Sequence, residues 1–246
     1  MMKKILFLFI LFSVVTFSKT ITIAVATNVS YAIDALKKKF NTKYPDIKVN
    51  VILGSSGKLT TQIKNSAPFG LFMSADMRYP TLLFKEKIAI KKPVIYAQGK
   101  LVLFSPKPQV FSQDLSILTQ PNIKRIAIAN PKTAPYGKAS LQALKNAKIN
   151  KKIDSKLIYA QSLSQTLSYT LIATDIGFIS KSSLFSKKMK KYKENIHWKE
   201  INSTLYTPIN QGIVLLNKKA SYQKFYNFIL SHEAKNILKN YGYSVQ

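Results

Sequence analysis

Small hydroxyl, amide and glycine residues follow two apolar runs in the first third of the chain, and neither group contains a charged side chain. Thr27 and Asn28 follow the run at 21–26, and a Gly-Ser-Ser-Gly sequence at 54–57 follows the run at 49–53. Apolar residues at helical spacing come next in both cases. A helix N-terminus presents unpaired backbone N–H groups, and beside hydroxyls or amides it suits an oxyanion. The predicted chemistry is therefore binding by neutral hydrogen-bond donors.

Two later segments repeat this arrangement. The run at 126–129 leads to Tyr136 at the beginning of a predicted helix, and the run at 156–160 leads to a turn at 161–165 that contains Leu163. Because ligands of open α/β sheets bind outside the carboxyl ends of strands, the four turns could converge on one cleft. Ordinary N-capping also places Ser, Thr and Asn at helix starts, so the sequence leaves both interpretations open at each turn.

Side chains suited to catalysis are scarce. The sequence has no cysteine, its two histidines are His197 and His232, and its ten carboxylates show no metal-ligand spacing. The Gly-Ser-Ser-Gly turn matches neither the Gly-x-Ser-x-Gly of a nucleophile elbow nor a P-loop, in which Ser or Thr follows the lysine. We therefore predict a protein that is not an enzyme and that holds neither a cofactor nor a metal cation.

The N-terminus has the pattern of a secretory signal. Two lysines, Lys3 and Lys4, precede an uncharged apolar run at 5–17, which is shorter than the roughly 20 residues needed to span a bilayer. We predict a signal peptide at 1–18, with an uncleaved anchor as the alternative. Without a cysteine there is no site for the lipid anchor of a lipoprotein, and the predicted location is the periplasm.

The net charge of +28 raises a second function class, a basic nucleic-acid-binding or adhesion module. Nearly all the cations are lysines, with Arg78 and Arg125 as the two arginines, whereas arginine is the usual reader of base edges. The lysines are spread along helical patterns and loops. This distribution is typical of solvated faces, and we predict no nucleic-acid partner.

Strand and helix patterns alternate along the chain, which predicts an α/β fold with sheets covered by helices. Short apolar runs predict further strands at 101–104, 176–179 and 213–216. Helices are predicted at 138–148, 222–230 and 233–241.

Five motifs together give the chain a resemblance to a known family. They are Val25-Ala26-Thr27-Asn28; Gly54-Ser55-Ser56-Gly57-Lys58-Leu59; Ala67-Pro68 with Leu71-Phe72-Met73-Ser74-Ala75-Asp76; Asn130-Pro131 with Ala134-Pro135-Tyr136-Gly137; and Tyr241-Gly242-Tyr243. With these motifs the chain resembles the periplasmic molybdate-binding proteins that feed ABC importers, over essentially all of the mature sequence.

The resemblance implies a two-lobed, type II periplasmic binding protein fold, with mixed, mostly parallel sheets and a ligand cleft between the lobes. Lobe 1 would comprise 19–96 and 208–246, and lobe 2 would comprise 97–207. The protein would act as a monomer and deliver molybdate or tungstate to the membrane permease of an ABC importer. Molybdenum would thus be bound as an oxyanion.

The resemblance also implies the ligands. Thr27 and Asn28 would donate from side chain and backbone, Ser55 or Ser56 from the second turn with Ser56 preferred, Tyr136 from the other lobe, and Leu163 through its backbone N–H. One branch of the family has a tyrosine where this chain has Ser180, and this chain resembles the other branch. Sulfate or another oxyanion is the alternative ligand, and the sequence does not separate molybdate from tungstate.

Overall fold

The computed structural model describes residues 19–245, apart from the side chains at 112–114, and contains two five-stranded sheets. The predicted signal peptide at 1–18 lies outside the described residues. The first sheet has the order β2-β1-β3-β10-β4. Its strands are β1 (Lys19–Ala26), β2 (Ile47–Gly54), β3 (Leu71–Ser74), β4 (Val94–Gly99) and β10 (Ile209–Leu215). Only β10 runs against its neighbours, β3 and β4.

The second sheet repeats this plan with the order β7-β6-β8-β5-β9. Its strands are β5 (Leu101–Phe104), β6 (Ile126–Ala129), β7 (Leu157–Ala160), β8 (Ile176–Ser180) and β9 (Trp198–Glu200). Here β5 is the strand that runs against its neighbours, β8 and β9. Each sheet is therefore mixed and mostly parallel, as expected from the sequence.

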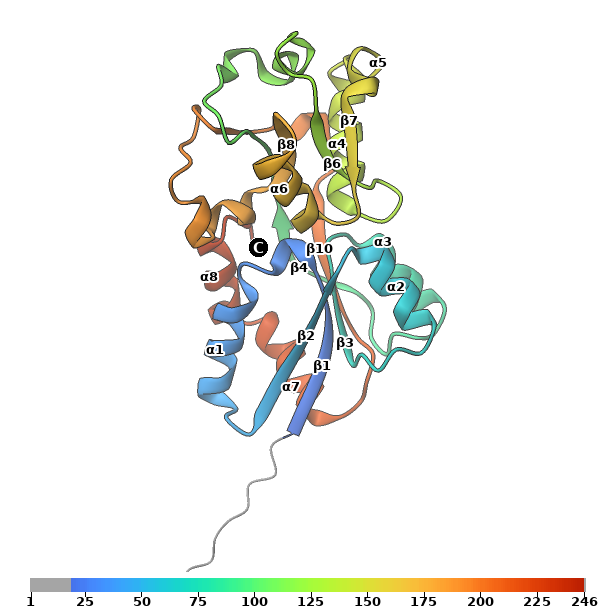
Figure 1. Cartoon of the computed structure of the whole chain (residues 1–246). Helices are drawn as coiled ribbons and strands as arrows, with labels where there is room; N and C mark the ends of the chain where they lie inside the picture. Colours follow the sequence, from blue (N-terminus) through green and yellow to red (C-terminus); the bar gives the residue numbers. More distant parts are fainter. Residues whose placement is uncertain (1–18, 246) are drawn as a thin grey trace, which may run out of the picture.

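Helices cover both faces of each sheet, so that two lobes stand one above the other (Figure 1). The lower lobe carries α1 (Ile33–Lys43), α2 (Ser56–Lys64), α3 (Arg78–Lys85), α7 (Ala220–Ile229) and α8 (His232–Asn240). The upper lobe carries α4 (Pro135–Asn146), α5 (Asn150–Ile153) and α6 (Leu163–Ile172). Short 3-10 turns are η1 (Thr27–Val29), η2 (Phe111–Thr119), η3 (Asp154–Lys156), η4 (Lys181–Phe185), η5 (Lys187–Met189) and η6 (Ser203–Leu205).

The inner strands are nearly continuous in apolar residues because both of their faces are buried, whereas the edge strands β2 and β7 are partly exposed. In β1, Ile23 and Val25 point into the core formed with α1, α7 and α8. Ala24, between them, packs on the opposite face with Leu59 of α2. The second sheet divides its side chains in the same way between a core on the α4 face and one on the α6 face. This two-sided burial fixes the strand register and hence the positions of the strand ends.

The structure corrects the first predicted helix. The helical spacing of Val29, Ile33 and Phe40 predicts one helix directly after β1, but the chain forms the short turn η1 and then begins α1 at Ile33. Val29 still packs in the same buried cluster as Phe40, which explains the apolar spacing. The separate turn leaves Thr27 and Asn28 at the end of the strand, outside the long helix.

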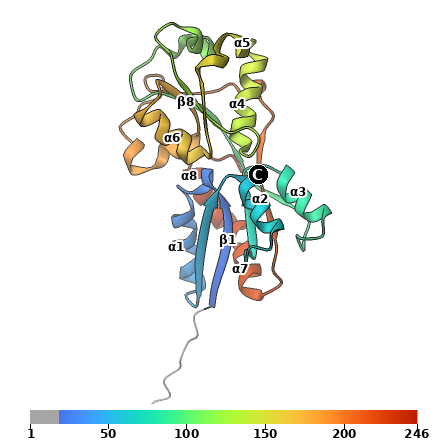
Figure 2. The ribbon, with the colours of Figure 1, turned by 45° about the vertical axis from the view of Figure 1, so that its right-hand side comes forward.

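The chain crosses between the sheets twice. The first crossing is at Lys100, between β4 and β5, and the second follows β9 and returns the chain to β10. Figure 2 shows the narrow waist where both crossings lie. Because β4 continues to Gly99, the first sheet extends three residues past the predicted lobe boundary at 96. We retain the division into 19–96 with 208–246 and 97–207 as a proposal.

Gly70 has a clear packing reason in lobe 1. A Cβ atom at this position would lie 2.2 Å from the Tyr222 ring, and the Tyr222 hydroxyl accepts a hydrogen bond from the backbone N–H of Thr22. The missing side chain thus allows α7 to pack closely against β1. No helix among residues 19–245 is long and apolar enough to cross a membrane.

Candidate functional site

The turn after β1 is buried between the lobes. Thr27 and Asn28 form the beginning of η1, and Asn28 is 1% exposed. Its side-chain Nδ2 donates to Gln211 Oε1 at 2.7 Å and to the Tyr243 hydroxyl at 3.0 Å. Both protons of this amide nitrogen are therefore used inside the protein. Since the first N–H groups of a helical turn have no acceptor within it, Asn28 is suited to donate from its backbone.

The turn after β2 brings two serine hydroxyls to the same place. Ser55 is the N-cap residue of α2, but its side chain makes no capping bond, and its buried Oγ has no hydrogen-bond partner among the described residues. Ser56 Oγ accepts the backbone N–H of Ala75 at 2.9 Å, which leaves its own proton available for donation. Both serines are thus able to donate to a bound group.

The second sheet supplies the opposite wall. Tyr136 lies at the beginning of α4 and is 2% exposed, and its hydroxyl makes no hydrogen bond within the described residues, although the Gln211 amide is close. Burial, with smaller contributions from the neighbouring hydroxyls of Tyr243 and Tyr96, raises the pKa of Tyr136 well above its ordinary value. The side chain is therefore a neutral donor at physiological pH. Leu163, the first residue of α6, lies in the same wall.

These turns enclose one small pocket between the lobes, at the facing ends of both sheets. It is lined by Ala26, Thr27, Asn28, Gly54, Ser55, Ser56, Ala75, Ala134, Pro135, Tyr136 and Leu163. All six residues predicted as ligands line it, and none of the lining side chains is charged at neutral pH. An ionised acceptor strengthens each hydrogen bond, so converging neutral donors can hold a buried anion. The roles of the six residues as ligands remain a prediction.

The capping alternative can be compared turn by turn. The helical turns η1, α2 and α4 have no side-chain cap, whereas Ser162 caps α6 by accepting the backbone N–H of Gln165 at 3.2 Å. Ordinary capping therefore accounts for the polar residue before α6 only. At the other three turns the hydroxyls lie in the pocket without satisfying the helix end.

Hydrogen bonds from α2 and α3 join the lobes on one side of this pocket. The backbone N–H of Gly57 donates to the Thr133 carbonyl at 2.9 Å. The Tyr79 hydroxyl donates to the Lys132 carbonyl at 3.2 Å, and Lys58 Nζ donates to Gln161 Oε1 at 2.6 Å. The structure thus shows the lobes closed on each other beside the pocket.

Other sequence candidates lie elsewhere. Ser180 hydrogen-bonds Ser182 and Ser183 at 2.8 Å each and does not line the pocket. His197 Nδ1 accepts the Lys193 N–H, and His232 pairs with Asn236 four residues along α8. Within the described part of the chain, no three His, Cys, Asp or Glu side chains come together as metal ligands would.

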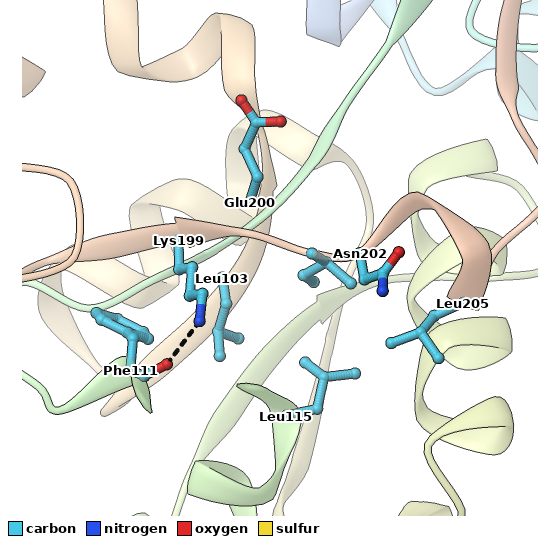
Figure 3. A pocket seen from close by; sticks show the side chains of 8 residues that line it. Leu103, Phe111, Leu115, Lys199, Glu200, Asn202 and Leu205 are labelled. Carbon is cyan, nitrogen blue, oxygen red and sulfur yellow. Dashed lines mark hydrogen bonds between the residues drawn. The ribbon is translucent and has the colours of Figure 1, made fainter. Parts of the chain in front are cut away.

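A second hollow in lobe 2 has a different character (Figure 3). Core side chains such as Leu103, Phe111 and Leu115 form much of its wall, and Lys199 donates to the Phe111 carbonyl at 3.0 Å. Glu200, at its edge, is paired with Lys100 and Lys181. Its charged groups are paired within the protein.

Two residues that hold the pocket in place were not predicted as part of the site. Gln211 lies in β10 and fixes the Asn28 amide, and the buried hydroxyl of Tyr243 binds both the amide and the carbonyl of Asn28. The sequence could have indicated Gln211 as a functional candidate, because it is a polar residue within the apolar run of β10. Its partner lies 183 positions away, and the sequence pattern does not identify it.

Two lobes on similar mixed sheets, closing on a neutral pocket at their strand ends, define a two-lobed solute-binding protein. The family model described as bacterial extracellular solute-binding protein matches residues 21–244. The chain belongs to this family. Its predicted resemblance is confirmed by two curated relatives, both called molybdate-binding protein ModA. The relative from Azotobacter vinelandii is 33% identical over 92% of this chain and 90% of its own length, and the one from Rhodobacter capsulatus is 31% identical over 79% and 77%.

Solved structures agree with this assignment. The periplasmic molybdate-binding protein of Azotobacter vinelandii has a TM-score of 0.84 and 29% identity, covering 92% of this chain and 99% of that chain. The sulfate-binding protein SubI of Mycobacterium tuberculosis has a TM-score of 0.74 at 12% identity, covering 92% and 86%, and shows a shared fold. The predicted two-lobed fold is confirmed.

Proposed function

We propose that this protein captures molybdate or tungstate in the pocket between its lobes and delivers the anion to the membrane permease of an ABC importer. The observation that carries the proposal is the lining of the pocket: uncharged donors from both sheets, with the buried hydroxyls of Ser55 and Tyr136 otherwise unpartnered. The names of the curated relatives support molybdate as the ligand.

The donors in this proposal are the six predicted residues. Thr27 donates from its hydroxyl and Asn28 from its backbone, because the Asn28 amide nitrogen is already used. Ser56 and Ser55 donate from the second turn, Tyr136 from α4, and Leu163 through the N–H at the beginning of α6. A pocket composed of donors disfavours a protonated phosphate, which brings a donor of its own. Cavity size would separate molybdate and tungstate from the smaller sulfate.

The remaining features of the proposal follow from this role. The protein carries anions without chemical conversion and without a cofactor, acts as a monomer, and works outside the cytoplasm after removal of a signal peptide at 1–18. Its exposed lysines occur on helices and loops of both lobes, as at 38–39, 151–152 and 187–188. This spread supports a solvated surface without a nucleic-acid partner.

Calorimetric titration of the chain from Lys19 onward with molybdate, tungstate, sulfate and phosphate tests the proposal. We expect one-to-one binding of the first two and no comparable heat from the others. Tyr136→Phe removes one donor to the charged ligand and should weaken molybdate binding by about 1–3 kcal/mol. Tighter binding of sulfate would identify sulfate as the ligand in place of molybdate. If none of the four anions binds and the protein binds polyanions in a salt-sensitive way, the basic nucleic-acid-binding or adhesion module is favoured.

A further inference from the structure

The C-terminal segment after α8 returns to the site. Gly242 adopts a φ of +77°, which a residue with a side chain rarely adopts, and the chain then lies along β4. Ser244 exchanges two backbone hydrogen bonds with Gln98, at 2.7 and 2.9 Å. The turn and the pairing hold Tyr243 between them, and its side chain is buried at 5% exposure.

The hydroxyl of Tyr243 lies behind the anion-binding turn. It donates to the Asn28 carbonyl at 2.8 Å and accepts from Asn28 Nδ2 at 3.0 Å. This single group thus holds both the main chain and the side chain of Asn28. Tyr243 does not line the pocket, and its contact with a bound anion would be indirect.

The same carbonyl is also bound from the other lobe. Ser182, at the beginning of η4, donates its hydroxyl to the Asn28 carbonyl at 2.8 Å and lies 3.3 Å from the Tyr243 hydroxyl. Ser180 in turn hydrogen-bonds Ser182. The turn after β1, the C-terminal segment and the end of β8 therefore meet at one buried point.

We propose that Tyr243 is a positioning residue for the anion site: through its two hydrogen bonds to Asn28 it keeps the turn in the donor conformation that lobe closure requires. This inference rests on the proposed function for its ligand. Without the hydroxyl, the Asn28 amide nitrogen retains Gln211 as its one acceptor, and the carbonyl retains Ser182 as its one donor. The turn would then be less constrained before the anion arrives, and ordering it would reduce the affinity.

The test compares Tyr243→Phe with Tyr96→Phe in calorimetric titration with molybdate. Tyr96 is a suitable control because it lies in the same core, is equally buried, and its hydroxyl has no hydrogen-bond partner among the described residues. We expect Tyr243→Phe to weaken molybdate binding about 3- to 10-fold, as the loss of one or two hydrogen bonds predicts, and Tyr96→Phe to stay within about twofold of the wild type. Equal affinities of both variants would overturn the proposal.

Hydrogen exchange in the ligand-free protein provides a readout that does not depend on molybdate. Tyr243→Phe should speed exchange in a peptide covering 27–31 while leaving the middle of β1 unchanged, and Tyr96→Phe should not do so. A uniform increase over the whole lobe would show a merely structural role and reject the proposal. If the wild type fails to bind molybdate, the proposed function is wrong, and the exchange data still decide whether Tyr243 positions the turn.

Discussion

Individual side chains in the pocket differ in how their hydrogen bonds are already used. Ser56 Oγ accepts the Ala75 N–H, and the Asn28 amide nitrogen is occupied by Gln211 and Tyr243. Ser55 and Tyr136 keep their hydroxyls without a partner. A buried hydroxyl without a partner costs about 1–3 kcal/mol, and a ligand that accepts its proton removes this cost. The hydroxyls of Ser55 and Tyr136 are therefore the groups whose hydrogen bonds to a ligand should contribute most to the free energy of binding.

Alanine variants of the two serines should differ in stability. Ser55→Ala removes an unpartnered hydroxyl, so the ligand-free protein should be as stable as the wild type or slightly more so. Ser56→Ala leaves the Ala75 N–H without its acceptor and should lower the free energy of unfolding by about 1–3 kcal/mol. Urea titration measures the stability of each variant, and calorimetry with molybdate measures its affinity. An unchanged affinity in Ser55→Ala would exclude that hydroxyl as a donor.

Buried tyrosines should make the protein sensitive to alkali. Burial raises the pKa of Tyr96, Tyr136 and Tyr243 above the ordinary value of 10 in the folded state. Below pH 10 these hydroxyls are neutral in both states; above it the unfolded chain releases protons that the folded chain retains. The free energy of unfolding should then fall by up to about 4 kcal/mol per pH unit. The circular dichroism signal should be lost together with the last part of the rise in tyrosinate absorbance, which comes from these buried hydroxyls.

Removing one of these tyrosines gives the control. Tyr96→Phe leaves the other two of these hydroxyls and should reduce the slope of stability against pH above pH 10 by up to about 1.4 kcal/mol per pH unit. A complete rise in tyrosinate absorbance before the fold is lost would show that the buried hydroxyls ionise in the folded protein, against this prediction.

At the scale of elements, the helix starts determine how closely the lobes approach. Gly57, at the beginning of α2, donates to Thr133 across the cleft. A Cβ atom there would lie 2.6 Å from the Tyr79 hydroxyl and 3.0 Å from both Cα and O of Thr133. Because Thr133 contributes backbone atoms, it cannot move aside as a flexible side chain would. The absence of a side chain at Gly57 thus permits the observed closure.

Gly57→Ala should therefore impair closure more than folding. We expect a ligand-free unfolding temperature close to that of the wild type, because open lobes avoid the Thr133 backbone and the Tyr79 hydroxyl, at the end of its side chain, can shift. Molybdate affinity should fall roughly tenfold or more, since closure costs about 1–3 kcal/mol extra. Gly70→Ala is the control: its Cβ would meet the Tyr222 ring inside lobe 1, so it should lower stability without a specific loss of affinity. Unchanged affinity in Gly57→Ala would show that the anion binds without this approach.

The sequence predicts most elements whose pattern is local. The strands at 101–104 and 126–129 are observed with the predicted bounds because they are short, fully buried apolar runs. The sequence does not predict β9, because its three residues are only half-buried and two of them are charged. This strand depends on its pairing with β5, about a hundred positions away. The site shows the same limit: strand ends followed by polar turns indicate its walls, while Gln211 and Tyr243 depend on contacts between distant segments.

In the whole molecule, charge and binding site are separated. The chain carries a net charge of +28, yet no charged side chain lines the pocket. A surface field of this sign attracts a dianion over distances of about one Debye length, which is about 10 Å at 0.1 M salt. The bound anion is in contact with neutral dipoles alone, and these are screened far less by salt than exposed charges. The rate of association with the anion therefore depends on the surface lysines, whereas its rate of dissociation depends on the neutral donors of the pocket.

Salt should then slow association more than it speeds dissociation. Between low salt and about 0.5 M sodium chloride, we expect the association rate constant for molybdate to fall roughly tenfold, because the lysine field is screened. The dissociation rate constant should change less than about twofold, since release requires the lobes to open and the neutral hydrogen bonds to break. Both rate constants can be measured by stopped-flow fluorescence of Trp198, the single tryptophan, or by competition with a labelled anion.

A double variant provides the control. Replacing Lys187 and Lys188, which are exposed and lie outside the pocket, by Gln should lower the association rate constant at low salt and leave it unchanged at high salt. A dissociation rate that rises in parallel with salt would place charge in the binding step itself and contradict the separation.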